Sequence, residues 1–426
     1  MNSFKNKEIW ISGFALFSLF FGAGNLILPT SLGVKAGFNW WIVLLGFAIT
    51  AVVIPILSIF AHAKLQGTLF DFGKKVSPIF STIFCLLTYA IAIAIPGPRT
   101  AAVTHEMAVQ PFFNSSPLLT SSIYFGLVFV FVINRSKIID VIGKFLTPII
   151  VIILLIIIVL AIISSPENNL LPTIKSPFVD GILEGFQTFD AIAGVVVGAV
   201  MIVSLNLGNL HTFDEKKDVI SKSGLIAGVG LLLIYGGLIF SGFLFSATFP
   251  ENATRIDILT SLSLQTLGDF GRILLSVLVA LACFTTAVGV VTGTADYIKG
   301  ICKNSQKAFV ITTAICAIIG ILVGSFQVDF IIILAVPALM FLYPITIVLI
   351  VLNVLPKNFR SKLVFRAVVF TTFLFSIPDF LGFIIDEKYL VSIKNSIPLA
   401  NNNLGWVLPS LLVFVVVNLF KKKHYY

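Results

Sequence analysis

Twelve long apolar stretches follow one another along this chain of 426 residues, separated by short polar segments. A helix needs roughly 20 apolar residues to cross the hydrocarbon core of a bilayer. Inside lipid a spanning segment must also satisfy its own backbone polar groups, which favours helices. The sequence therefore predicts an all-α integral membrane protein with 12 transmembrane helices. We place them at about 9–34, 40–63, 79–102, 117–134, 141–163, 183–205, 223–247, 270–295, 308–325, 328–353, 363–384 and 404–420.

The composition excludes an ordinary soluble protein. Hydrophobic residues make up 58% of the chain and charged residues 11%, whereas about a quarter of a soluble domain is charged. The four cysteines form no Cys-x-x-Cys pair, so we predict neither a disulfide framework nor a metal site of the cysteine type. Because no long polar insertion interrupts the pattern, residues 1–426 are predicted to form a single domain embedded in membrane lipid.

The distribution of Lys and Arg predicts the orientation. If the N-terminus lies in the cytoplasm, the loops on the cytoplasmic side carry 21 of the 28 Lys and Arg residues. Cytoplasmic loops of membrane proteins are enriched in these residues. We therefore predict that both termini are cytoplasmic. The same enrichment explains the net charge of +9 without a nucleic-acid partner.

Small and polar residues interrupt the first apolar stretch near its middle. Gly22, Gly24 and Asn25 lie close together, and Pro29 follows. Glycine weakens a helix interior, and asparagine competes for backbone hydrogen bonds. An unwound helix here would offer free N–H groups to an anion such as a carboxylate, and free carbonyl groups to a cation. The alternative is an intact helix whose small residues allow close packing.

An acidic residue interrupts the sixth stretch. Asp190 lies well inside an apolar run, and such residues usually face a cavity or a transport pathway. The alternative is a short loop in which Asp190 is the N-cap of a helix that starts near Ala191. Breaks five helices apart point to an inverted-repeat transporter with a site at mid-membrane. The two halves of the sequence show no convincing residue-level match, so the repeat itself is not visible.

Two adjacent hydroxyl groups occur in the eighth stretch. Thr285 and Thr286 could complete a cation site made of oxygen atoms, which are the ligands that hard cations prefer. The alternative is that each hydroxyl bonds a carbonyl of its own preceding turn.

A single arginine lies close to the outer end of the third stretch, after Pro96 and Pro98. We expect the Arg99 side chain to snorkel to the membrane interface, with a role in an outer gate as the alternative. His105 and Glu106 follow, and we expect them in a wet loop.

Five motifs in this order resemble the bacterial branched-chain amino acid:cation symporter family of the amino acid–polyamine–organocation superfamily, from the first helix to the twelfth. They are Phe-Phe-Gly-Ala-Gly-Asn-Leu-Ile-Leu-Pro (20–29), Pro-Arg-Thr-Ala (98–101), Ser-Lys-Ile-Ile-Asp-Val-Ile-Gly-Lys-Phe-Leu-Thr-Pro (136–148), Phe-Asp-Ala-Ile-Ala-Gly (189–194) and Ala-Leu-Ala-Cys-Phe-Thr-Thr-Ala-Val-Gly (280–289).

The resemblance implies a leucine-transporter-like 5+5 inverted repeat with broken helices 1 and 6. Helices at about 9–163 would form the first repeat, helices at about 183–353 the second, and two extra C-terminal helices at about 363–420 an accessory pair. The implied substrate-binding residues are Gly22, Ala23, Gly24, Asn25, Gln187, Thr188, Phe189 and Asp190. The implied sodium ligands are Ser18, Phe21, Ala282, Thr285 and Thr286, with Arg99 as a gate residue.

The function implied by the resemblance is secondary active symport of leucine, isoleucine and valine into a bacterial cell across its plasma membrane. Alternating access would couple this uptake to Na⁺ or H⁺ without a cofactor. Thr285 and Thr286 favour sodium, whereas Asp190 could instead carry a proton. Another small amino acid or solute is the alternative substrate, and the sequence leaves the oligomeric state open. A membrane-embedded enzyme is disfavoured because the four histidines are scattered along the chain.

Overall fold

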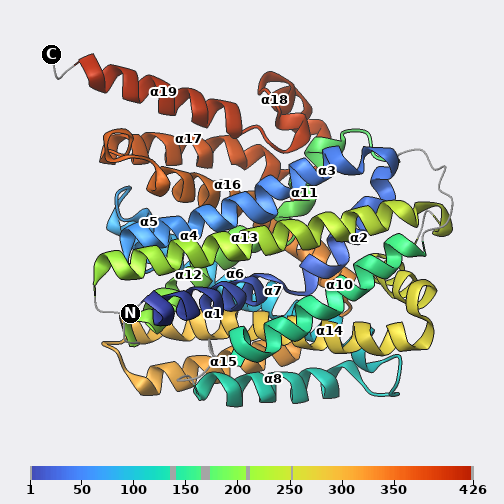
Figure 1. The fold of residues 1–426 in the computed structure, drawn as a ribbon. Helices are drawn as coiled ribbons and strands as arrows, with labels where there is room; N and C mark the ends of the chain where they lie inside the picture. Colours follow the sequence, from blue (N-terminus) through green and yellow to red (C-terminus); the bar gives the residue numbers. More distant parts are fainter. Residues whose placement is uncertain (1, 135–140, 165–172, 208–211, 251–252, 424–426) are drawn as a thin grey trace.

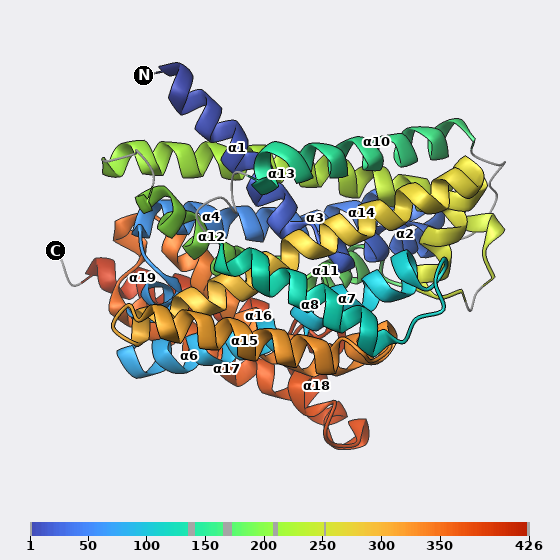
Figure 2. The same cartoon turned by 90° about the horizontal axis from the view of Figure 1, so that it is seen from below.

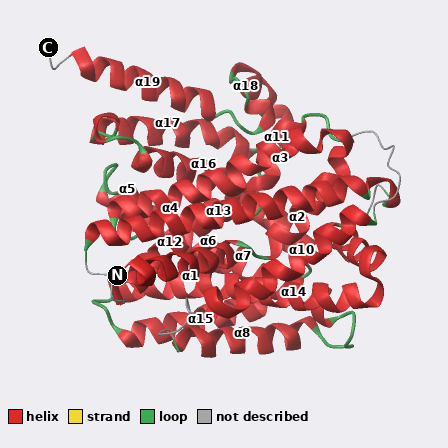
Figure 3. Ribbon diagram, viewed as in Figure 1, coloured by secondary structure: helices red, strands yellow, loops and turns green. Residues whose placement is uncertain are grey.

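The computed structural model describes residues 2–134, 141–164, 173–207, 212–250 and 253–423 (Figure 1). All regular secondary structure in these ranges is helical, as Figure 3 shows, so the prediction of an all-α protein is confirmed for the described chain. The start of the motif at 136–148 and the basic residues Arg135 and Lys137 lie outside the described residues.

The helices cover the predicted apolar stretches, but α1 and α13 begin at Asn2 and Phe213 instead of near residues 9 and 223. The first part of the chain forms α1 (Asn2–Phe20), α2 (Ala23–Ala36), α3 (Trp40–Ala48), η2 (Ile49–Val53), α4 (Ile54–Leu65), α5 (Leu69–Gly73), α6 (Pro78–Ala94), α7 (Pro96–Thr104), η3 (His105–Val109), α8 (Pro117–Ile133), η5 (Ile142–Leu146) and α10 (Thr147–Ile163). The second part forms α11 (Pro177–Phe186), α12 (Asp190–Leu207), α13 (Phe213–Leu244), α14 (Arg255–Ile301), α15 (Gln306–Val323), α16 (Val328–Val354), α17 (Lys362–Leu381), α18 (Val391–Ser396) and α19 (Val407–Lys423).

The lengths of these helices fit a protein that crosses the membrane many times. Within the described residues, nine helical segments are long and apolar enough to span a bilayer, and residues 117–133 and 407–420 form shorter apolar helices. Large apolar side chains are exposed on the outer helices; Ile79, Leu233 and Ile333 are 74%, 67% and 71% exposed. Lipid is the environment in which such surfaces are stable. The count of twelve spans and their division into two repeats stay predictions.

The eighth helix begins earlier than predicted. α14 starts at Arg255 instead of near residue 270, and it bends at Gly268, whose φ is 61°. The Thr254 hydroxyl caps its first turn by accepting from the Asp257 N–H at 3.1 Å. Apolar patterning missed this first arm because the segment before Gly268 is a short capped amphipathic helix, whose apolar residues alternate with polar ones and form no continuous apolar stretch.

The helices that carry the predicted breaks lie in the interior of the bundle. α1 and α2 pack against α13, and α12 packs against α14. α17 and α19 lie at one edge, where α17 packs on α16 and α19 on α17 (Figure 1). In the view turned by 90°, the first turns of α1 project beyond α13, and the other end of α1 runs past α13 into the bundle (Figure 2). This arrangement brings the two breaks together at the centre of the protein.

Candidate functional site

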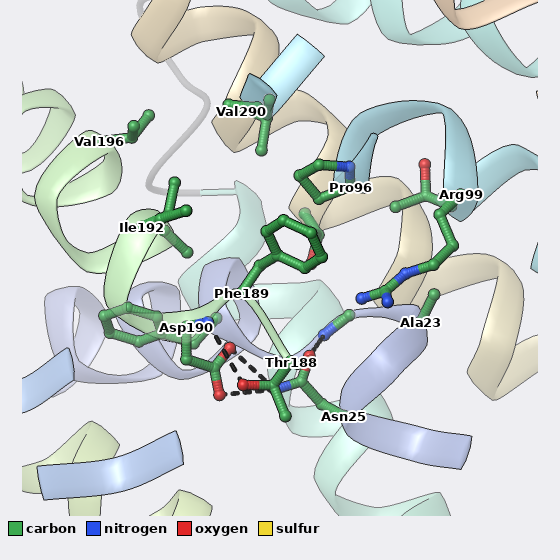
Figure 4. A pocket seen from close by; sticks show the side chains of 16 residues that line it. Ala23, Asn25, Pro96, Arg99, Thr188, Phe189, Asp190, Ile192, Val196 and Val290 are labelled. Atoms are coloured by element: carbon green, nitrogen blue, oxygen red, sulfur yellow. Dashed lines mark hydrogen bonds between the residues drawn. The ribbon is translucent and has the colours of Figure 1, made fainter. Parts of the chain in front are cut away.

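The two helix breaks predicted from the sequence face each other. One separates α1 from α2 at residues 21–22, and the other separates α11 from α12 at residues 187–189. Asn25 Nδ2, in the first turn of α2, donates to Asp190 Oδ1 at 2.9 Å and to Oδ2 at 2.8 Å (Figure 4). Both side chains are almost fully buried. A direct hydrogen bond between buried groups therefore ties one break to the other.

A small cavity lies between the breaks. Its free volume of about 20 Å³ is enough for roughly one water molecule. Its lining comes from both breaks and from α6, α7 and α14: Phe20, Gly22, Ala23, Asn25, Ala92, Pro96, Arg99, Thr100, Thr188, Phe189, Asp190, Ile192, Ala193, Val196, Thr286 and Val290. The apolar lining from α6, α12 and α14 faces a polar end formed by the breaks. The site is closed in this conformation.

Tyr235 in α13 belongs to the same network, although we did not predict it. Its hydroxyl donates to Asp190 Oδ2 at 3.0 Å and is also hydrogen-bonded to Asn25 Nδ2. Tyr235 is fully buried. The signal in the sequence was a lone phenol in the middle of an apolar stretch, since a buried tyrosine hydroxyl usually finds a partner.

The start of α2 has free hydrogen-bond donors. Gly22 is extended (φ −120°, ψ −159°) and offers no side chain to cap the helix. Its own N–H donates to Asn25 Oδ1 at 3.0 Å. A Cβ atom on Gly22 would lie 2.7 Å from Thr286 Oγ1, so glycine is also required for close contact with α14. The helix is therefore unwound here and not intact, and the small residue at the break also allows close packing against α14.

The start of α12 is capped by side chains. Phe189 holds a left-handed backbone with φ 65°. Thr188 Oγ1 accepts from the Asp190 N–H at 3.3 Å, and the Tyr343 hydroxyl of α16 accepts from the Ala191 N–H at 3.1 Å. α12 begins at Asp190, close to the start near Ala191 that the loop alternative gave. The N-cap role of that alternative is wrong, because the Asp190 carboxylate accepts from Asn25 and Tyr235 and caps no N–H group among the described residues of α12.

The expectation that Arg99 snorkels to the interface is wrong. Its side chain is only 3% exposed and lines the central cavity. Nη1 donates to the Gln187 carbonyl at 3.0 Å, and the guanidinium carbon lies 5.3 Å from the centre of the Phe189 ring. A Cβ atom on Gly24 would lie 2.5 Å from Nη2. The guanidinium can therefore turn inward because Gly24 leaves room for it. Two predicted substrate-binding residues, Gly24 and Gln187, lie beside Arg99 and do not line the cavity.

The wet loop expected after Arg99 is also wrong. The helix continues in π-helical form through Val109. His105 is 5% exposed, with Nδ1 2.9 Å from Thr120 Oγ1, and Glu106 Oε1 accepts from the Val328 N–H at 2.9 Å. Partners on α8 and α16 satisfy these groups, which a loop would leave to water. Both residues still border a larger cavity of about 470 Å³ at this end of the bundle.

The hydroxyl groups predicted for a cation site come together in part. Ser18 Oγ donates to Thr285 Oγ1 at 3.0 Å, and Thr285 Oγ1 lies 2.9 Å from both the Ser18 and the Ala282 carbonyl oxygens. Thr286 Oγ1 is buried and has no hydrogen-bond partner in the described chain. Phe21 stands at the break, where its N–H still donates to the Phe17 carbonyl at 2.8 Å. An oxygen-rich cluster joining α1 to α14 suits a hard cation.

The sequence matches a known family and several named proteins. Residues 5–424 match the family model described as branched-chain amino acid transport protein. The branched-chain amino acid permease BraB of Bacillus subtilis is 33% identical over 424 residues, which cover 96% of this chain and 94% of the permease. The branched-chain amino acid transport system 2 carrier protein of Pseudomonas aeruginosa is 32% identical over 425 residues, covering 98% and 96%.

Solved structures of other transporters share the fold. Mhp1, a nucleobase-cation-symport-1 family transporter in a closed conformation, has a TM-score of 0.58 at 12% identity, covering 95% of this chain and 91% of Mhp1. The Eremococcus coleocola manganese transporter has a TM-score of 0.61 at 14% identity, covering 96% and 94%. A Na⁺-coupled sialic acid symporter has a TM-score of 0.59 at 11% identity, covering 96% and 89%. At these identities the likeness concerns the fold alone.

Proposed function

This chain belongs to the family of branched-chain amino acid transport proteins and is a transporter, not an enzyme; from this premise we propose that it carries leucine, isoleucine and valine into the cell by cation symport. The observation that carries the proposal is the pair of facing helix breaks around a buried cavity. Discontinuous helices of this kind form substrate and ion sites near the middle of the bilayer. We further propose that the membrane is the bacterial plasma membrane and that both termini are cytoplasmic.

The substrate would bind as a zwitterion. Its carboxylate would accept from the N–H groups of Ala23 and Gly24, because a helix N-terminus favours an anion. Its ammonium group would lie near Asp190 and the carbonyl groups that end α11. Its branched side chain would contact the apolar lining formed by Ala92, Ile192, Val196 and Val290. The polar and apolar ends of the cavity thus match the two ends of a branched-chain amino acid.

Transport would require the cavity to open, because about 20 Å³ cannot hold an amino acid. In alternating access the helices around the site separate on one side of the membrane and then on the other. The conformation described here has the properties of a closed stage in that cycle. The hydrogen bond between Asn25 and Asp190 would hold the broken helices together at this stage.

The coupling cation would bind between α1 and α14. We propose sodium, held by the carbonyl oxygens of Ser18, Phe21 and Ala282 and by the hydroxyl groups of Thr285 and Thr286. The support for this site is the oxygen cluster around Thr285, with the unpartnered Thr286 hydroxyl beside it. A proton carried by Asp190 is the competing mechanism.

The experiment is uptake of labelled isoleucine into proteoliposomes that contain the purified full-length chain. A sodium gradient and a proton gradient are imposed separately. The proposed cation site is supported if a sodium gradient drives uptake and if Thr286→Val reduces that uptake at least about tenfold. Thr313→Val is the matched control, because the Thr313 hydroxyl is buried in α15 and bonds a carbonyl of its own helix. Uptake driven by a proton gradient alone would show that this site does not bind the coupling ion. Folded protein that takes up none of the three amino acids would overturn the substrate assignment.

A further inference from the structure

We propose that Arg99 binds the carboxylate of the substrate, so that the anion site consists of the α2 N-terminus and a buried guanidinium acting together. This inference rests on the proposed function, because it deepens the description of how an amino acid is held. From the sequence, Arg99 was expected to reach the membrane interface or to belong to an outer gate. The proposal instead gives Arg99 a direct contact with the substrate.

The first argument is the unused bonding capacity of Arg99. An arginine side chain carries a permanent charge and five N–H donors. Nη1 is engaged by the Gln187 carbonyl, whereas Nε is buried and has no acceptor in the part of the chain that the structure describes. None of the ion pairs between described residues involves Arg99. A buried cation without an anion is costly, and a carboxylate is the partner that a guanidinium binds best.

The second argument is the fixed position of the guanidinium. Gln187 holds Nη1, and the Phe189 ring lies beneath the guanidinium carbon at 5.3 Å, close enough for a cation–π interaction. The absence of a side chain on Gly24 lets Nη2 come close to the first turn of α2. Two contacts, together with the space left by Gly24, thus orient the guanidinium before any ligand arrives, which reduces the entropy lost on binding.

The third argument is charge complementarity across the cavity. Figure 4 shows the Arg99 side chain descending toward the start of α2 near Ala23, while the Asp190 carboxylate lies apart from it beside Asn25 and Thr188. Asp190 is bonded to Asn25 and Tyr235 and does not pair with Arg99. The Arg99 guanidinium and the Asp190 carboxylate therefore border one cavity without pairing with each other. In a zwitterionic amino acid the carboxylate complements the guanidinium and the ammonium group complements Asp190.

The test compares leucine with leucinamide, which keeps the ammonium group and the side chain but replaces the carboxylate with a neutral amide. Binding to the purified full-length protein is measured by calorimetry in sodium buffer at mildly acidic pH. Wild type should prefer leucine strongly. Arg99→Gln should weaken leucine binding roughly 10- to 100-fold while leaving leucinamide binding nearly unchanged. Arg366→Gln, an exposed arginine of α17, is the matched control and should change neither ligand.

Gly24→Ala provides a second variant in case Arg99→Gln fails to fold. The added methyl group would displace Nη2 while keeping the charge, so the preference for leucine over leucinamide should again shrink. Equal losses of affinity for leucine and leucinamide in these variants would show that Arg99 only links α7 to the second break. An unchanged affinity for leucine would show that Arg99 does not touch the carboxylate. Wild-type protein that binds no branched-chain amino acid would overturn both this inference and the proposed function, whereas the other two outcomes overturn the inference alone.

Discussion

Two breaks interrupt helices in this protein, one between α1 and α2 and one between α11 and α12. The first break presents hydrogen-bond donors, whereas the second presents acceptors. At the first break the N-cap is Gly22, which has no side chain, so the first N–H groups of α2 face the cavity region uncapped. At the second break Thr188 and Tyr343 already accept from the first N–H groups of α12. The first break therefore has spare donors, and the second presents Asp190 and backbone carbonyl groups.

This difference would let two similar breaks hold the two ends of the zwitterionic substrate that we propose. Spare N–H groups attract the carboxylate, whereas an acidic side chain and carbonyl oxygens attract the ammonium group. If both breaks had been capped, the cavity would lack an anion site. Four substitutions test this division of roles.

The largest effect is expected from Asn25→Ala, because Asn25 is the direct link between the breaks. Asp190 and the Gly22 N–H would both lose a partner, and unpaired buried groups cost about 1–3 kcal/mol each. The free energy of unfolding should fall by about 3 kcal/mol and uptake by about 100-fold. Thermal unfolding and proteoliposome uptake measure the two effects.

Asn353→Ala is the control for Asn25→Ala. Asn353 is equally buried and donates to the Phe72 and Leu349 carbonyls far from the cavity. It should lower stability while leaving uptake per folded molecule unchanged. Equal loss of uptake in both variants would mean that stability alone explains the effect.

A smaller effect is expected from Gly22→Ala, which acts on the first break alone. The new methyl group would lie 2.7 Å from Thr286 Oγ1, so α2 and α14 would have to separate slightly. Overpacking of this kind costs about 1–3 kcal/mol, and uptake should fall roughly tenfold. Gly126→Ala in α8 is the control, since its Cβ would meet no atom within 4 Å. Normal uptake by Gly22→Ala would show that close contact at this break is dispensable.

Tyr343→Phe should have a weaker effect, because it makes the second break resemble the first. The Ala191 N–H loses its acceptor, while the ring contact between Phe186 and residue 343 is kept. Loss of one hydrogen bond is worth about 1 kcal/mol, so leucine affinity measured by calorimetry should fall about fivefold. A loss as large as that caused by Asn25→Ala would mean that the capped N-terminus of α12 matters as much as the open one.

The smallest effect is expected from Glu184→Gln. Glu184 of α11 pairs with Arg255 of α14 at 2.8 Å, and the two side chains are 18% and 21% exposed. The pair is partly buried, but glutamine keeps an acceptor for the Arg255 guanidinium, so the loss should stay at about 1 kcal/mol and uptake should change by less than about fivefold. A double-mutant cycle with Arg255→Gln gives the coupling energy directly. Coupling well above 1 kcal/mol would make this pair a substantial restraint on the second break.

The helices and the two breaks could be predicted because their signals are local. Apolar length defines a spanning helix, and Gly22, Gly24 and Asp190 interrupt it within a few residues. The partners of the site could not be predicted in the same way. Tyr235 and Tyr343 lie 45 and 152 residues from the groups in α12 that they bind, so only the packing of α13 and α16 brings them there.

Arg99 shows why the depth of a charged residue is hard to predict. Its place near the end of an apolar stretch is typical of a snorkelling side chain. Its inward direction depends on a glycine in another helix and on the Gln187 carbonyl at the break between α11 and α12. Sequence spacing contains none of these relations. The first arm of α14 was missed for another reason, because its mixed apolar and polar residues do not form a continuous apolar stretch.

The left-handed backbone of Phe189 is strained while the site is closed. A residue with a side chain held at φ 65° is disfavoured by about 1–2 kcal/mol relative to the right-handed helix. The surrounding contacts of α11 and α12 impose this conformation while the site is shut. If opening lets Phe189 return to the right-handed region, the strain energy that is released offsets part of the free energy needed to separate the broken helices.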